Sequence, residues 1–192
     1  MRRREFIAAL GSAATWPLAA RAQQPERVRR IALFMNLPEE DGWSKRCIAA
    51  FRQGLAELGW IEGRNVHIDY RWATTDPRSI PISVAELIAL EPDVILASAS
   101  NVLAAFLKAT STISIVFVSV SDPVGQGFVT SLERPSGHIT GFTAFEFSMG
   151  GKWMELLKEI APSIRRVAVL FNPKTAPYFP LFLPICSVSR ST

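Results

Sequence analysis

From residue 30 onward, short apolar runs alternate with stretches in which apolar residues recur every three or four positions. The runs have the length of strands and the stretches have the length of helices. Because a helix separates each strand from the next, the strands are expected to run parallel, with right-handed crossovers and helices on both faces. This alternation therefore predicts an α/β fold with an open, mostly parallel sheet.

The predicted elements can be placed along the chain. We expect strands at residues 30–35, 66–72, 93–97, 113–120, 139–142 and 166–171. We expect helices at residues 43–58, 82–90, 102–110 and 149–160, a short helix at 128–132 and the start of another at 177–183. The strand at 66–72 alternates apolar and polar residues, which is typical of an edge strand with one exposed face.

One predicted strand ends in a notably polar turn. The apolar run at 94–97 stops at Ser98, and Ser100 and Asn101 come directly before the helix that is predicted from Val102. A helix N-terminus has free backbone N–H groups and the positive end of the helix dipole, and open α/β sheets bind ligands at the carboxyl ends of their strands. This turn is therefore a candidate site for a carboxylate or another anion, although a serine there can also simply cap the helix.

The first 22 residues have the features of an export signal. Arg3-Arg4-Glu5-Phe6-Ile7 matches a twin-arginine pattern, an alanine-rich stretch follows, and Ala20-Arg21-Ala22 is a small-x-small cleavage site. We therefore expect a periplasmic protein, exported by either the twin-arginine or the general route; an amphipathic first helix is the alternative. No permanent membrane span is predicted, because the apolar stretch is shorter than the roughly 20 residues required and contains Pro17.

Charge and cysteine content argue against other classes of protein. Four arginines in residues 1–22 account for most of the net charge of +4, and the rest of the chain has 17 basic and 16 acidic residues. The basicity is therefore no sign of nucleic-acid binding. The two cysteines, Cys47 and Cys186, are too few for a disulfide framework, and Cys47 falls among apolar helix residues, where a buried thiol is expected.

The sequence contains no enzyme motif. There is no P-loop and no GxSxG nucleophile elbow, and Gly125 and Gly127 form only a fragment of a GxGxxG fingerprint. His67 and His138 do not have metal-ligand spacing. We therefore expect a binding protein with no catalytic residues, no cofactor and no metal; an exported α/β enzyme is the alternative.

Several segments resemble one family, the ABC-transporter substrate-binding proteins of the periplasmic-binding type I fold, in the group with tryptophan- and tyrosine-binding members. The most specific match is the spacing of SDPV, ERPSG and ITG within IVFVSVSDPVGQGFVTSLERPSGHITG. Further matches are the signal, AFRQGLAELGWIEGRNVHIDYRWA and WMELLKEIAPSIRRVAVLFNP, so that the resemblance runs from Met1 to about Pro180. It implies a two-lobed protein that closes on a small organic ligand, such as an amino acid or another carboxylate, and delivers it to the permease of an ABC importer. A ligand-sensing module that serves a receptor is the alternative function.

The resemblance also implies which residues bind the ligand. Ser98, Ser100 and Asn101 would hold its α-carboxylate through hydroxyl, amide and backbone N–H groups. Asp122 would pair with its ammonium group, or else only form a turn before the proline that follows. Phe145 could stack on an aromatic ligand or pack in the core. The other candidates are polar residues at neighbouring strand ends: Asn36, Ser119, Ser121 and Thr143.

The same resemblance divides the chain into four parts. Residues 1–22 are the signal, residues 27–145 the first ligand-binding lobe, residues 146–183 the start of a second lobe, and residues 184–192 an irregular tail. Family members are longer, with a second lobe of similar size. We therefore expect a C-terminally truncated chain, which a shifted reading frame near Pro184 would explain, and a non-functional fragment is a further alternative.

Overall fold

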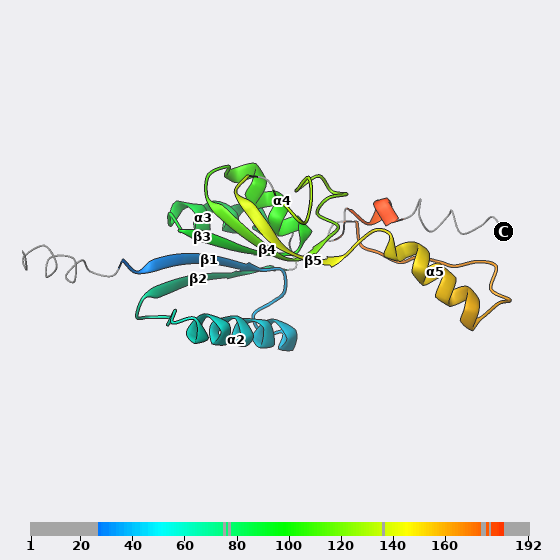
Figure 1. The fold of residues 1–192 in the computed structure, drawn as a ribbon, viewed down its shortest axis with the longest axis horizontal. Coiled ribbons are helices and arrows are strands. Elements are labelled where there is room, and N and C mark those ends of the chain that lie inside the picture. The colour runs from blue at the N-terminus through cyan, green and yellow to red at the C-terminus, as the bar shows by residue number, and fades with distance from the viewer. Residues whose placement is uncertain are drawn as a thin grey trace, which may run out of the picture.

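The computed structural model describes residues 27–182 except 75, 77, 136, 174, 175 and 177, so the predicted signal and the predicted irregular tail lie outside the described residues. Ten elements follow one another along the described chain (Figure 1). They are β1 (Arg29–Met35), α2 (Gly42–Glu57), β2 (Val66–Trp72), α3 (Ser79–Ala89), β3 (Val94–Ser98), α4 (Ser100–Ala109), β4 (Ser114–Ser121), β5 (Ile139–Phe145), α5 (Met149–Ile160) and the 3-10 helix η1 (Phe179–Phe182).

The five strands form one parallel sheet in the order β2-β1-β3-β4-β5. β2 lies at an edge, as its alternating sequence predicts, with Val66 and Ile68 buried and His67 exposed. α2 covers one face of the sheet, and α3 and α4 cover the other (Figure 1). The prediction of an open parallel α/β sheet with helices on both faces is confirmed.

β1 is buried on both faces and contributes side chains to two cores in turn. Ala32 and Phe34 belong to the core under α3 and α4, whereas Ile31 and Leu33 belong to the core under α2. Phe106 of α4 meets Phe34 edge to face, with ring centroids 6.4 Å apart. Burial on both faces explains why this strand is a continuous apolar run in the sequence.

The predicted helix at 128–132 is wrong. The chain turns earlier, where Gln126 N–H donates to Asp122 O over 3.0 Å. Gly127 ends this turn with a φ of +75°, a backbone conformation that glycine adopts without steric cost. The residues that follow run irregularly towards β5.

The predicted strand at 166–171 is also wrong. This segment has no strand partner among the described residues, and its apolar side chains lie open, with Leu170 99% exposed. A strand forms only where a neighbour satisfies its backbone N–H and C=O groups, so an apolar sequence alone does not make one. Of the helix predicted to start at 177–183, the described residues form only η1.

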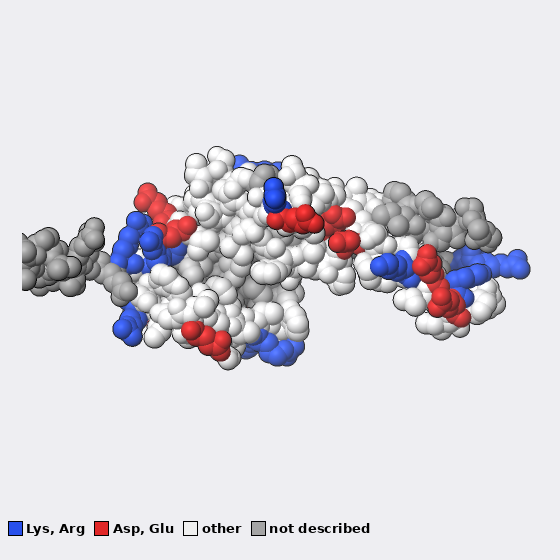
Figure 2. Space-filling view, viewed as in Figure 1, with Lys and Arg blue, Asp and Glu red and all other residues white. Residues whose placement is uncertain are grey.

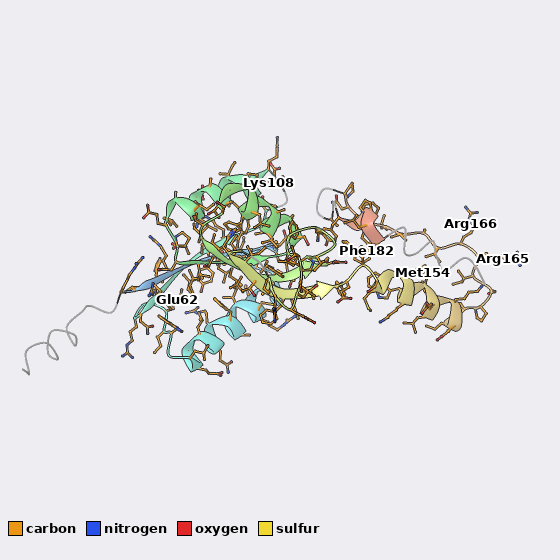
Figure 3. The ribbon with its side chains drawn as sticks, turned by 45° about the horizontal axis from the view of Figure 1, so that its top comes forward. Glu62, Lys108, Met154, Arg165, Arg166 and Phe182 are labelled. Atoms are coloured by element: carbon orange, nitrogen blue, oxygen red, sulfur yellow. The ribbon has the colours of Figure 1, made fainter. Side chains whose placement is uncertain are left out.

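The predicted amphipathic helix at 149–160 is formed as α5, which extends from β5 past the carboxyl ends of the strands (Figure 1). Its Trp153 contacts both Phe145 of β5 and Phe182 of η1; Phe182 is labelled in Figure 3. Trp153 stacks on Phe182 with ring centroids 5.9 Å apart, and Phe182 meets Phe147 at 4.6 Å. Further along the helix, Leu156 is 55% exposed and Ile160 81%, so much of its apolar face is open.

Gly141 allows β5 to lie close against β4. A β-carbon there would approach Phe117 Cγ to 2.6 Å and would also collide with the Phe117 carbonyl oxygen. We predict that Gly141→Ala lowers the free energy of unfolding by about 3 kcal/mol, because backbone atoms of a buried strand cannot move aside. The matched control is Gly54→Ala in the middle of α2, where nothing lies within 4 Å; it should raise stability by about 0.5–1 kcal/mol. Urea unfolding measures both, and a Gly141→Ala chain of unchanged stability would refute the close approach.

Asp93, just before β3, links the amino-terminal ends of β1 and β3. Its carboxylate accepts the Arg30 backbone N–H over 2.8 Å and Arg29 Nη1 over 3.0 Å, and Arg27 Nη2 lies 3.3 Å away. The Arg30 N–H first, and then the Arg29 and Arg27 guanidinium groups, hold the pKa of Asp93 below its usual value.

Because this pKa is lowered by folding, the Asp93 carboxylate stabilises the fold above its unfolded-state pKa of about 3.9, and the contribution is lost as the pH falls through the folded-state pKa. We predict that Asp93→Asn lowers the free energy of unfolding by about 1–3 kcal/mol near neutral pH and by progressively less below about pH 4. Urea unfolding across this pH range is the measurement, with Glu133→Gln in an exposed loop as the control. A difference that stays constant with pH would contradict this role.

Candidate functional site

The carboxyl ends of β3 and β4 lie side by side. The two strands pair in parallel as far as Ser98 and Val118. Just beyond, Ser121 N–H donates to Ser100 Oγ over 3.2 Å, which joins the two strand ends directly. The candidate residues at these two strand ends therefore lie together, at the carboxyl end of the sheet.

Gln126 crosses between the same two strand ends. Its side-chain Nε2 donates to Ser100 Oγ over 2.9 Å and, through a short bond, to the backbone carbonyl of Ser121. Sequence reasoning missed this residue, because it follows β4 by several positions and only the turn from Asp122 brings it back. The available signal was the turn-forming sequence Asp-Pro-Val-Gly, which precedes it.

Backbone strain is concentrated here. Among the described residues, four non-glycine residues have positive φ, and three of them lie at these strand ends: Ala99 at 78°, Ser119 at 55° and Asp122 at 37°. Ala99 combines its φ with a ψ of 159°, a region that is nearly exclusive to glycine and costs about 1–3 kcal/mol. Ser119 lies in a bulge, since the register of β4 on β5 shifts between Phe117 and Val120. Strain and bulges of this kind cluster at functional sites.

α4 begins two residues earlier than predicted, so Ser100 and Asn101 are its first residues. Ala99 is the N-cap and no side chain caps the helix, so neither Ser98 nor Ser100 has the capping role considered above. Asn101 Nδ2 instead donates to Asn36 Oδ1 over 3.0 Å. This bond brings the end of β1 to the start of α4.

The Asp122 carboxylate stabilises the turn in which it lies. Its Oδ1 accepts the Gly125 N–H over 2.7 Å and its Oδ2 accepts the Phe147 N–H over 3.1 Å. The carboxylate thus fixes both the turn after β4 and the link from β5 to α5, as expected of an aspartate that forms a turn. Each oxygen keeps capacity for one further donor.

The other predicted site residues differ in exposure. Ser98 and Ser121 are buried, at 8% and 6% exposed, whereas Ser119 is exposed. Ser121 takes part through its backbone, since its N–H and C=O bond to Ser100 and Gln126. Its hydroxyl is therefore not the group that links the strand ends.

Thr143 and Phe145 lie on β5, beside the bulge. Thr143 Oγ1 donates to Val120 O over 3.1 Å, so this hydroxyl helps to close the bulge. Phe145 is 52% exposed and meets Trp153 edge to face, with ring centroids 6.1 Å apart. Core packing of Phe145, one of the two alternatives from the sequence, is therefore not what the structure has.

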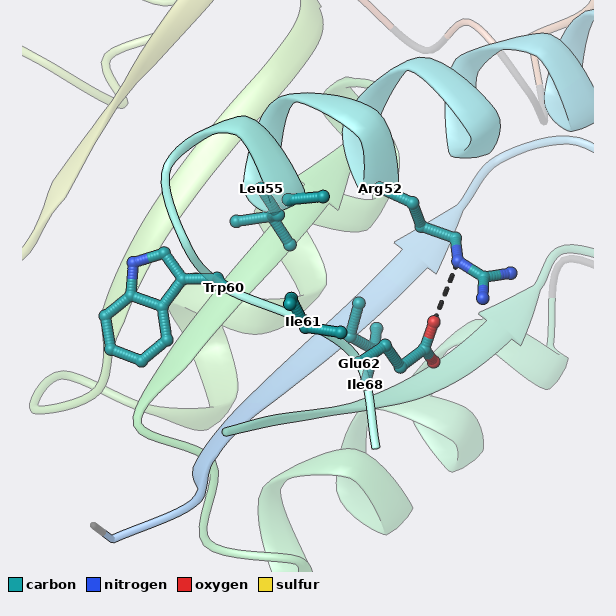
Figure 4. A pocket seen from close by; sticks show the side chains of 7 residues that line it. Arg52, Leu55, Trp60, Ile61, Glu62 and Ile68 are labelled. Atoms are coloured by element: carbon teal, nitrogen blue, oxygen red, sulfur yellow. Dashed lines mark ion pairs between the residues drawn. The ribbon is translucent and has the colours of Figure 1, made fainter. Parts of the chain in front are cut away.

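Two surface hollows lie along α2 instead. The first, of about 160 Å³, is crossed by an ion pair of 2.8 Å between Arg52 Nε and Glu62 Oε2 (Figure 4). Burial, and then Glu62, raises the pKa of the nearby Tyr70 to about 12. The second, of about 210 Å³, lies between α2 and Trp72. Both are smaller than the roughly 300 Å³ at which ordinary ligand pockets start, and neither is lined by a predicted site residue.

Charge and metal-binding groups do not suggest another kind of site. On the face shown in Figure 2, lysine and arginine side chains are scattered and mixed with acidic ones, without a continuous basic stripe. Within the described ranges, no three His, Cys, Asp or Glu residues come together as metal ligands would. None of the described helices has the length and apolarity that crossing a bilayer requires. The strand ends, where the predicted site residues lie, therefore remain the candidate site.

Known proteins are similar to this chain in both sequence and structure. The model of the family described as ABC transporter substrate binding protein matches residues 37–180. A tyrosine-binding protein of Clostridioides difficile (strain R20291) is 30% identical over 122 residues, which are 64% of this chain and 35% of that protein.

Two solved structures show the same fold. A conserved domain protein from Vibrio cholerae has a TM-score of 0.69 and 30% identity, over 85% of this chain and 53% of that one. An ABC domain in complex with L-Trp from Streptococcus pneumoniae has a TM-score of 0.68 over 85% of this chain and 55% of that one; at 19% identity it supports the fold alone. The chain therefore spans between about a third and about half of the length of these relatives.

The family match covers most of the chain, and the family consists of substrate-binding proteins rather than enzymes. The parallel sheet and its strand order agree with one lobe of the periplasmic-binding type I fold. The chain belongs to the ABC transporter substrate-binding protein family.

Proposed function

We propose that this chain carries the first ligand-binding lobe of an exported solute-binding protein that supplies a small organic molecule to an ABC importer. Residues 27–145 form that lobe and residues 146–183 begin a second one, which would close over the ligand. The family supports the binding role. The permease partner and the periplasmic location are supported by the family and by the export-signal sequence of residues 1–22.

The observation that carries the proposal is the direct bond between the ends of β3 and β4, from Ser121 N–H to Ser100 Oγ. This bond places the first turn of α4 among the polar residues at the carboxyl ends of β3 and β4. The Ser100 and Asn101 N–H groups begin the helix and have no partner within it, and Ala99 offers no side-chain cap; the next N–H, that of Val102, is accepted by Asn101 Oδ1 over 3.0 Å. A ligand carboxylate is the group that such N–H donors and the helix dipole favour.

We propose an amino acid with an aromatic ring, or a related aromatic carboxylate, as the ligand. The relative from Clostridioides difficile, 30% identical over 122 residues, is named a tyrosine-binding protein. Ser98, Ser100 and Asn101 would hold the carboxylate, with Asn36, Ser119, Ser121 and Thr143 around them. The spare acceptor capacity of Asp122 suits the ammonium group, and the half-exposed ring of Phe145 suits stacking on an aromatic ligand.

Ser100→Ala tests the carboxylate site. We predict that it weakens the binding of L-tyrosine or L-tryptophan by about 10- to 100-fold, the loss expected of one hydrogen bond to a charged group. Isothermal titration calorimetry is the measurement, and Ser114→Ala, an exposed serine at the opposite end of β4, is the matched control. If no aromatic amino acid binds the unsubstituted chain, the proposed ligand class is wrong. Equal affinities of the two variants would remove Ser100 from the site.

Asp122→Asn separates the two roles of this aspartate. Asparagine can accept only one of the two backbone N–H groups, so we predict a loss of about 1–3 kcal/mol in the free energy of unfolding. If Asp122 also pairs with the ligand ammonium, L-tyrosine should lose more affinity than 3-(4-hydroxyphenyl)propionate, which lacks the amine. Calorimetry with both ligands measures this, and equal losses would leave Asp122 with the turn-forming role alone.

A further inference from the structure

The orientation of the Gln126 side-chain amide is fixed by its surroundings. The Ser121 carbonyl oxygen can only accept a hydrogen bond, so the amide group that faces it must be the NH2. The same nitrogen lies 2.9 Å from Ser100 Oγ. An amide nitrogen is not an acceptor, so in this bond the serine hydroxyl accepts.

The Ser100 hydroxyl therefore has both lone pairs occupied. One accepts from Gln126 Nε2 and the other accepts from the Ser121 N–H over 3.2 Å. A serine oxygen has two lone pairs and one O–H, so the hydrogen is left to donate. No acceptor for it is found among the described residues. Ser100 is only 3% exposed, and a buried donor without an acceptor is unfavourable.

We propose that Gln126 is a positioning residue that sets the ligand specificity of this site. By occupying the hydroxyl oxygen, it obliges Ser100 to act as a donor towards the ligand. The site then favours a ligand group that only accepts, such as a carboxylate, over a carboxamide that must also place an NH2 group there. This inference rests on the proposed function, because it takes the ligand to bind at this strand end.

The groups around Ser100 also favour a ligand group that accepts hydrogen bonds. The Asn101 side-chain amide is engaged at both ends, since Nδ2 donates to Asn36 Oδ1 and Oδ1 accepts the Val102 N–H, each over 3.0 Å. The Ser100 and Asn101 backbone N–H groups begin α4, so they have no acceptor within the helix. A ligand NH2 placed at this point would face the Ser100 O–H and these two N–H groups, all of them donors, which is the kind of mismatch by which a site rejects a close analogue.

The test compares L-tyrosine with L-tyrosinamide, by calorimetry on the full chain. For the unsubstituted chain we expect the acid to bind at least about tenfold more tightly than the amide. Gln126→Met frees a lone pair of the Ser100 oxygen and should reduce this preference to about threefold or less. Gln126→Glu should abolish the preference, since the new carboxylate would accept the Ser100 hydrogen and repel the ligand carboxylate. Gln53→Met, on the exposed side of α2, is the matched control and should retain the preference.

The outcomes separate the inference from the proposed function. If the Gln126 variants weaken both ligands equally, Gln126 is only structural and the inference is overturned, while the proposed function stands. If the unsubstituted chain binds neither ligand, the proposed function fails and the specificity inference fails with it. Hydrogen exchange of the Ser121 amide checks the bonding scheme without a ligand: Ser100→Ala should speed it, and an unchanged rate would refute the two-acceptor arrangement.

Discussion

The parallel pairing of β3 with β4 is the constraint on which the candidate site depends. Because both strands run in the same direction, their carboxyl ends lie at the same end of the sheet, and Ser121 can reach Ser100 through a single hydrogen bond. An antiparallel pair would have put these residues at opposite ends of the sheet. The cluster of polar residues at the strand ends thus follows directly from the alternation of strands and helices, which also gives strand ends a helix N-terminus beside them.

The strained turns at these strand ends are held by the well-packed strands and helices beside them. Ala99 follows directly on β3, whose Ile95 and Ala97 are fully buried, and it precedes α4, whose Phe106 is fully buried as well. A backbone conformation that is unfavourable for alanine persists only where the surrounding structure determines it. The rigid core on both sides of the turn provides this, and it fixes the direction in which Ser100 points.

Most of the fold could be predicted from the sequence, because strands buried on both faces are continuous apolar runs and the edge strand alternates. The failures have physical causes. The helix expected at 128–132 is not formed because Gly127 ends an earlier turn. The strand expected at 166–171 has no partner in the part of the chain that the structure describes, and no local pattern can supply one. At the site, the tendency of parallel sheets to bind ligands at the carboxyl ends of their strands correctly indicated Ser100 as a candidate. The position of Gln126 and the backbone strain at Ala99 depend on turn geometry, which the sequence pattern does not reveal.

The open apolar residues around β5, α5 and the segment at 166–171 affect how this chain behaves in solution. Ile160 is 81% exposed, Leu170 is 99% exposed, and β5 lies at the edge of the sheet with no strand on its outer side among the described residues. Edges and patches of this kind promote self-association, and sulfate or phosphate buffers strengthen it. We therefore expect the apparent melting temperature of this chain to depend on protein concentration and on the choice of salt, and we expect heating to cause precipitation rather than reversible unfolding.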